Sequence, residues 1–134
     1  MDTNGEQHAV VLVADNQQSV LKAVSSTLEK AGFTVLTAAD KATALQLFAS
    51  GARVRLAILD GAMPGNDLEE LVLCLNECRP GTPILLTSGG DDVAACANLG
   101  RPGQVRGFIR KPFRRSQLLG SVLNVLDEPL ALTA

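Results

Sequence analysis

The sequence predicts a doubly wound α/β fold, a five-stranded parallel sheet of order 2-1-3-4-5 covered by five helices. Three observations predict it. Short apolar runs of strand length alternate with longer segments of helical periodicity. The strand candidates are apolar at consecutive positions, as expected for strands buried on both faces of a parallel sheet. No linker or internal repeat interrupts the alternation, so we expect one domain over residues 9–127, between tails at 1–8 and 128–134.

The first half of the chain contains two strand–helix pairs. Gly32 suits the end of the first helix, since glycine is common just beyond a helix C-terminus. Asp40 is a candidate N-cap for the second helix, which we expect to end near Gly51. The predicted elements are a strand at 9–14, a helix at 18–31, a strand at 33–38 and a helix after Asp40.

The second half continues the same alternation. Pro80 and Gly81 close its first helix, while Gly100, Pro102 and Gly103 break the pattern after a short, weak helix. Right-handed crossovers between such strands favour a flavodoxin-like arrangement. The predicted elements are strands at 54–59, 83–86 and 105–109 and helices at 66–79, 91–99 and 114–126.

Composition excludes several classes of protein. The chain is 46% hydrophobic and 19% charged, which is typical of a globular protein. No apolar run approaches the ~18–20 residues that a membrane span needs, so we expect no membrane partner. The polar start lacks the features of a signal peptide, which makes a cytoplasmic location the expectation. The net charge of −2 argues against bulk nucleic-acid binding.

Basic residues are unevenly distributed. Six of the twelve fall within one stretch near the C-terminus. This stretch can be a solvated face or a local docking surface for an acidic partner. Its members are Arg101, Arg106, Arg110, Lys111, Arg114 and Arg115.

Polar side chains follow the apolar strands where the strands end. Asp15 and Asn16 follow the first strand, Asp60 ends the third, Thr87 ends the fourth and Lys111 follows the fifth. Carboxyl ends of parallel strands meet at one edge of the sheet, so these side chains should converge there. Two carboxylates at ~4 Å repel by about 4 kcal/mol at an effective dielectric of ~20, a cost that a cation removes. Oxygen ligands without histidine or thiolate indicate Mg²⁺.

Four short blocks of sequence surround these residues. They are Val11–Asp15, Leu59–Pro64, Pro83–Ser88 and Gly107–Phe113. In order and spacing they resemble the signature blocks of response-regulator receiver domains, the phosphoacceptor modules of two-component signalling. The resemblance extends from residue 8 to residue 127. It implies a phosphorelay switch domain, not an enzyme in its own right, that takes a phosphoryl group from a partner's phosphohistidine with Mg²⁺.

The resemblance also implies a role for each matched residue. Asp60 is the phosphoacceptor, Thr87 the switch hydroxyl, Phe108 the switch aromatic residue and Lys111 the site lysine, with a cis bond to Pro112. The implied metal ligands are Asp15, Asn16, Asp60 and the main-chain carbonyl of Ala62.

One residue departs from the family pattern. Where the family usually has a second acid after the first strand, this chain has Asn16. An amide oxygen still binds a cation, but fewer ligand charges weaken the binding. We therefore expect phosphorylation to demand more Mg²⁺ than in a standard receiver domain. Gly61, directly after the acceptor, is expected to leave Asp60 open to water.

The expected partners follow from what the chain lacks. It has no nucleotide-binding motif and its single histidine is in the N-terminal tail, so a sensor histidine kinase or a histidine phosphotransfer protein must donate the phosphoryl group. A downstream protein is expected on the face formed by the helix at 91–99, the strand at 105–109 and the last helix. The short tails resemble receivers at the ends of hybrid histidine kinases, and a weak dimer is compatible with the sequence.

Two other functions compete with this one. A pseudo-receiver would keep the fold but respond to partner contact instead of phosphate, and Asn16 supports it. A flavodoxin-like small-molecule binder should carry a hydroxyl- and glycine-rich loop after the first strand, and Gln17, Gln18 and Ser19 provide little of that.

Overall fold

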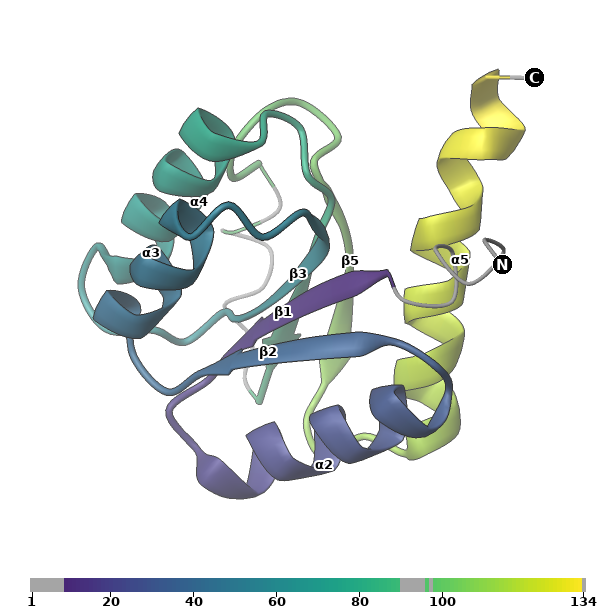
Figure 1. The fold of residues 1–134 in the computed structure, drawn as a ribbon. Coiled ribbons are helices and arrows are strands. Elements are labelled where there is room, and N and C mark those ends of the chain that lie inside the picture. Colours follow the sequence, from purple (N-terminus) through teal and green to yellow (C-terminus); the bar gives the residue numbers. More distant parts are fainter. Residues whose placement is uncertain (1–8, 90–95, 97, 134) are drawn as a thin grey trace.

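The computed structural model describes residues 9–89, 96 and 98–133, with side chains described up to residue 126. Five parallel strands form one sheet of order β2-β1-β3-β4-β5 (Figure 1). This order confirms the predicted doubly wound arrangement. The strands are β1 (Val10–Ala14), β2 (Thr34–Ala38), β3 (Val54–Asp60), β4 (Ile84–Ser88) and β5 (Val105–Arg110).

The described residues contain four of the five predicted helices. Nearly all element boundaries lie within two residues of their predicted positions. The last helix is the exception, because it continues to Thr133 instead of ending near residue 126. The predicted helix at 91–99 falls mostly on residues outside the described ones. The helices are α2 (Gln18–Lys30), α3 (Lys41–Ala49), α4 (Asp67–Cys78) and α5 (Arg115–Thr133).

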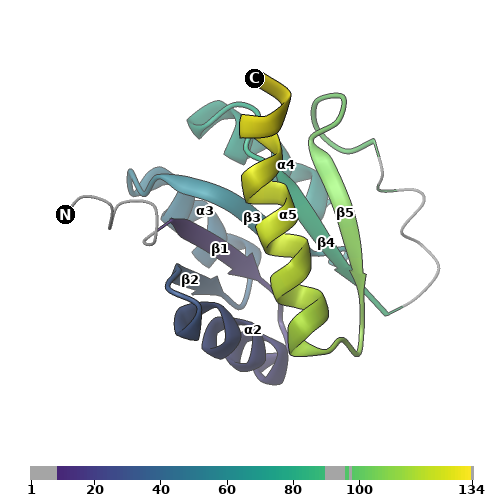
Figure 2. The same ribbon diagram turned by 90° about the vertical axis from the view of Figure 1, so that its right-hand side faces the viewer.

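The helices form a layer on each face of the sheet. Figures 1 and 2 show α2 and α5 on one face and α3 and α4 on the other. Side chains along a strand point alternately to the two faces. Val11 and Val13 therefore join the cluster under α2 and α5, while Leu12 and Ala14 join the cluster under α3 and α4. Burial on both faces explains why the strands read as continuous apolar runs.

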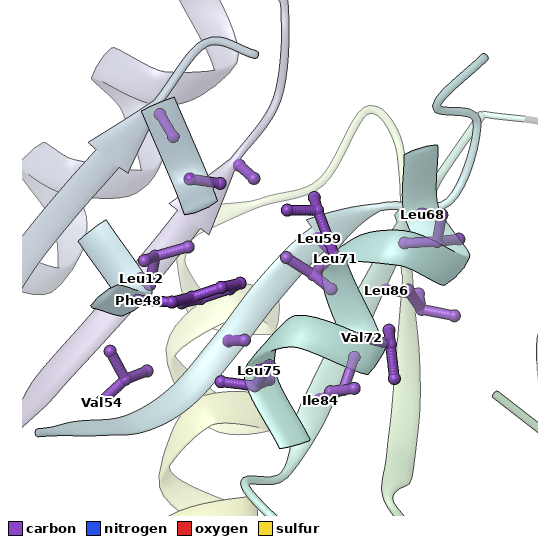
Figure 3. Packing of buried hydrophobic residues seen from close by; sticks show 14 residues of the cluster. Leu12, Phe48, Val54, Leu59, Leu68, Leu71, Val72, Leu75, Ile84 and Leu86 are labelled. Carbon is purple, nitrogen blue, oxygen red and sulfur yellow. The ribbon is translucent and has the colours of Figure 1, made fainter. Parts of the chain in front are cut away.

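The cluster between the sheet and helices α3 and α4 is closely packed (Figure 3). Leu12, Leu59 and Leu71 are fully buried there, and the ring of Phe48 is 3% exposed. Full burial of one such side chain contributes about 1.5–3 kcal/mol. This packing holds β1 and β3 in place, and with them the polar residues at their ends.

Two local features of the fold follow the sequence prediction. The carboxylate of Asp40 accepts a hydrogen bond from the backbone N–H of Thr43 at 2.8 Å, so it caps the start of α3. Gly32 has a φ of 100°, a left-handed conformation that lets the chain turn from α2 into β2. Both features position the loops at the edges of the sheet.

Candidate functional site

Three of the predicted site residues meet at the carboxyl edge of the sheet. Asp60 on β3 is the direct register partner of Thr87 on β4. Asp15 follows β1, and its backbone N–H donates to the carbonyl of Ala38 at 3.0 Å. Asp15, Asp60 and Thr87 are only 2%, 7% and 2% exposed. The sheet therefore buries two carboxylates and a hydroxyl side by side, as the strand-end pattern predicts.

Lys111 brings a positive charge to this edge. Its Nζ lies 2.8 Å from Oδ2 of Asp15 and 3.8 Å from Oδ1 of Asp60. The backbone N–H of Lys111 donates to the carbonyl of Ser88 at 2.7 Å, which anchors the start of the loop after β5 to β4. The bond to Pro112 is cis, as the family resemblance implies. The ammonium offsets part of the repulsion between the two carboxylates.

The turn after β3 orients the carboxylate of Asp60. Its Oδ1 accepts a hydrogen bond from the backbone N–H of Ala62 at 3.0 Å. Gly61 donates its own N–H to the carbonyl of Thr87 at 2.7 Å, and a Cβ added to Gly61 would lie 3.1 Å from that oxygen. Gly61 thus allows close approach of two backbones, a role that its position in the sequence did not reveal.

The hydroxyl of Thr87 has no partner among the residues that the structure describes. Its Oγ1 is buried and makes no hydrogen bond to any of them. Leaving a buried polar group unsatisfied costs about 1–3 kcal/mol, so such groups are uncommon in folded proteins. An oxygen of a ligand bound beside Asp60 could accept the hydrogen bond that Thr87 does not make within the protein.

Two hollows in the surface open beside Asp60. Asn16 and Asp60 line both of them. The larger, of about 700 Å³, also contains Ala62 and Lys111. The smaller, of about 220 Å³, contains Asp15. The other three predicted metal ligands therefore line these hollows together with Asp60, and Asn16 is exposed. We refer to Asp15, Asn16 and Asp60 as the acidic pocket.

The oxygen donors of the acidic pocket fit a hard divalent cation, although only two of them belong to charged groups. Within the described part of the chain, no group of three or more His, Cys, Asp or Glu side chains comes together to hold a metal ion. Two carboxylates, the amide of Asn16 and the carbonyl of Ala62 offer oxygen atoms, the ligands that Mg²⁺ prefers. The residues present fit Mg²⁺ with one ligand charge fewer than the family pattern provides.

Two residues near the pocket were not predicted from the sequence. The backbone N–H of Gln17 donates to Oδ1 of Asp15 at 2.9 Å, and its side-chain Oε1 accepts from Nζ of Lys111 at 3.0 Å. Lys41 lines the smaller hollow and donates to Glu70, which raises the pKa of Lys41 above its ordinary value. Gln17 follows Asp15 and Asn16 in the same loop, and that adjacency was the available signal.

Phe108, the predicted switch aromatic residue, lies away from the acidic pocket. It is the register partner of Leu86 on β4 and is 41% exposed. An exposed phenylalanine on an edge strand is available for contact with another surface. Neither Phe108 nor Thr87 lines the two hollows beside Asp60.

Comparisons with known proteins agree with the fold. The model of the response regulator receiver domain family matches residues 11–123. The chain is 34% identical over 111 residues to the C4-dicarboxylate transport transcriptional regulatory protein DctD of Rhizobium meliloti, covering 83% of this chain and 24% of that protein. It is 30% identical over 122 residues to sensor kinase CckA of Brucella abortus, covering 90% and 13%. The chain thus spans a quarter or less of these two curated relatives.

A solved structure matches over nearly its whole length. The chemotaxis response regulator CheY4 of Vibrio cholerae superposes with a TM-score of 0.75 at 32% identity, covering 89% of this chain and 99% of that one.

Fold and site together define a flavodoxin-like α/β domain with a carboxylate–lysine pocket at its switch point. The chain belongs to the response regulator receiver domain family of two-component signalling. Receiver domains are generally switch domains and not true enzymes. They generally bind Mg²⁺ at the phosphorylation site and interact with histidine kinases and downstream effectors. No helix among the described residues is long and apolar enough to cross a membrane.

Proposed function

We propose that Asp60 accepts a phosphoryl group from the phosphohistidine of a sensor histidine kinase or a histidine phosphotransfer protein. The observation that carries this proposal is the surroundings of Asp60. Thr87, at the neighbouring register position, has a buried hydroxyl without a partner in the described part of the chain, and the ammonium of Lys111 lies 3.8 Å from Asp60. An anion formed on Asp60 would therefore find a hydrogen-bond donor and a positive charge in place.

The transfer proceeds by displacement at phosphorus. A carboxylate oxygen of Asp60 forms the new P–O bond while the P–N bond to the donor's imidazole breaks, and the imidazole leaves with the electron pair and takes up a proton. The hydrogen bond from Ala62 to Oδ1 holds the carboxylate in one orientation. Transfer replaces the single negative charge of the carboxylate by a phosphoryl group carrying roughly −1.5 to −2, a net gain of up to about one negative charge in a site that the sheet has already buried.

The acidic pocket would hold the metal. Asp15, Asn16, Asp60 and the main-chain carbonyl of Ala62 are the residues that would bind Mg²⁺. When bound, Mg²⁺ neutralises the paired carboxylates and coordinates phosphoryl oxygens. The oxygen donors that line the two hollows beside Asp60 support this assignment.

The switch would pass from Thr87 to the surface. The new charge draws the hydroxyl of Thr87 and the ammonium of Lys111 towards Asp60. The space that Thr87 leaves would admit the ring of Phe108, which is 41% exposed in this structure. The face made by β5 and α5 then changes its affinity for a downstream protein. Arginines of β5 and of the start of α5 would give that face a preference for an acidic partner.

Beryllofluoride, a stable mimic of the phosphoryl group, tests the proposal. Addition of beryllofluoride with Mg²⁺ should shift the amide NMR signals of Thr87 and Phe108 in the wild-type protein and leave those of Asp60→Ala unchanged. Incubation with a phosphorylated histidine phosphotransfer domain should add the mass of one phosphoryl group to the wild type only. Absence of both effects at saturating Mg²⁺ would contradict the proposal and favour a pseudo-receiver controlled by partner contact.

A further inference from the structure

Both oxygens of the Asp15 carboxylate are engaged within the protein. Oδ1 accepts the backbone N–H of Gln17 at 2.9 Å, and Oδ2 accepts from Nζ of Lys111 at 2.8 Å. The side-chain oxygen of Gln17 accepts a second hydrogen bond from the same Nζ at 3.0 Å. One residue therefore contacts both members of the ion pair.

The arrangement holds Lys111 nearer to Asp15 than to the proposed acceptor. Its Nζ is 2.8 Å from Asp15 and 3.8 Å from Asp60, a difference of 1.0 Å. Gln17 occupies the N-cap position of α2, but its side chain makes no capping bond there. The exposed glutamine side chain instead reaches the lysine. Its hydrogen-bonding capacity is used at the site and not in the helix.

We propose that Gln17 is a positioning residue that retains Lys111 on Asp15 and thereby raises the Mg²⁺ concentration that the acidic pocket requires. An ammonium on Oδ2 neutralises the carboxylate on which a divalent cation depends. A hydrogen bond to a charged group is stronger than a neutral one, so Gln17 opposes the departure of the lysine. The inference rests on the proposed function, because it concerns the same metal site.

The test compares Mg²⁺ binding among five proteins: the wild type, Gln17→Met, Gln18→Met, Lys111→Met and the double variant Lys111→Met/Gln17→Met. The apparent Kd for Mg²⁺ is measured from amide NMR shifts of the loop residues around the acidic pocket, without any phosphodonor. Gln17→Met keeps the length of the side chain but removes its oxygen, and we expect Mg²⁺ to bind about fivefold more tightly, which corresponds to the ~1 kcal/mol net contribution of one exposed hydrogen bond. Gln18→Met is the matched control, because Gln18 is equally exposed and does not line the larger hollow. Its Kd should equal that of the wild type.

The dependence on Lys111 separates positioning from a general effect. In a Lys111→Met background, Gln17→Met should no longer change the Kd, because the lysine that it holds is absent. Unchanged or weaker Mg²⁺ binding by Gln17→Met would overturn the inference, and so would the same fivefold gain in the Lys111→Met background. If Lys111→Met does not fold, the comparison of the apparent Kd for Mg²⁺ between Gln17→Met and Gln18→Met still tests the inference. The free energies of unfolding of both variants are measured in parallel.

Failure of this inference is distinguishable from failure of the proposed function. If the inference alone is wrong, beryllofluoride still shifts the signals of Thr87 and Phe108 in the wild type, while the Kd of Gln17→Met matches that of Gln18→Met. If neither the wild type nor any variant binds Mg²⁺ or beryllofluoride, both proposals are overturned.

Discussion

At the scale of single residues, Thr87 combines two properties that a purely structural threonine would not have. Its hydroxyl is buried near the end of β4, and none of the described residues forms a hydrogen bond with it. A threonine selected for stability alone would satisfy its hydroxyl or be replaced by valine. The proposed switch role of Thr87 would account for this cost in stability.

Replacing Thr87 by valine, which has nearly the same shape, separates these two effects. We expect the free energy of unfolding to stay unchanged or to rise by up to about 1 kcal/mol, because an unsatisfied buried hydroxyl is removed. The shift of the Phe108 amide signal on addition of beryllofluoride should be lost. Chemical denaturation and NMR are the two measurements. A loss of stability would mean that the hydroxyl has a structural partner.

Asn16 is a second residue whose proposed role, as a metal ligand, can be tested by a single substitution. Asn16→Asp restores the carboxylate that the family pattern usually has at the rim of the acidic pocket. A third negative charge should lower the apparent Kd for Mg²⁺, by about tenfold if one further ligand charge contributes about 1.4 kcal/mol. NMR-monitored binding of Mg²⁺ measures the change, with Asn66→Asp outside the site as the control. Unchanged or weaker affinity would argue against Asn16 as a metal ligand.

At the scale of elements, each helix start and strand end fixes a loop that carries site residues. Helix α3 shows this clearly, because it begins beside the smaller hollow and its cap, Asp40, lines that hollow with Asp15 and Asp60. The hydrogen bond from the backbone of Thr43 holds the pKa of Asp40 below its usual range. The charged carboxylate is thus the form that caps the helix.

The cap makes the stability of α3 depend on pH in a defined direction. The folded-state pKa of Asp40 is lowered, so its contribution is fully present above the unfolded value of about 3.9 and is lost as pH falls through the folded value. Wild type should therefore exceed Asp40→Ala in thermal stability at neutral pH, and the difference should narrow below about pH 4. Melting curves against pH test this. Asp40→Asn, which caps without ionising, should show no such narrowing relative to Asp40→Ala.

At the scale of the whole molecule, two apolar clusters on opposite faces hold the sheet that carries the site. The strands end at one edge because both clusters fix their positions along the sheet. Leu59 is fully buried in the cluster under α3 and α4 and immediately precedes Asp60. The position of Asp60 therefore depends on the packing of the core and not on its own loop alone.

Truncation to alanine should lower the free energy of unfolding far more at a buried leucine than at an exposed one. Leu59→Ala should lower the free energy of unfolding by about 3 kcal/mol through lost burial and the cavity left behind. Leu73 on α4 is 61% exposed, and Leu73→Ala should change stability by less than about 0.5 kcal/mol. Denaturant-induced unfolding measures both. Equal effects of the two substitutions would contradict the packing described here.

Much of this protein could be predicted from its sequence because the signals are local. Apolar runs specify strands that are buried on both faces, and helical periodicity specifies the covering helices. Asp15, Asp60, Thr87 and Lys111 could be assigned to one edge because the ends of parallel strands must meet there. The end of α5 was missed, since weak periodicity beyond residue 126 does not mark where a helix stops.

Tertiary structure decided which side chains of that edge touch. Residue order places Gln17 in a loop, but only the approach of the segment after β5 brings Lys111 to its side-chain oxygen. The pairing of Lys111 with Asp15, the close approach of Gly61 to the backbone of Thr87 and the unsatisfied Thr87 hydroxyl likewise depend on contacts between strands distant in sequence. The sequence by itself determined the sheet and the residues at its edge. Their distances and partners were decided by the packing of the two helical layers against the sheet. A sequence pattern indicates which residues are buried and in which kind of element, but not how far apart two residues lie in space.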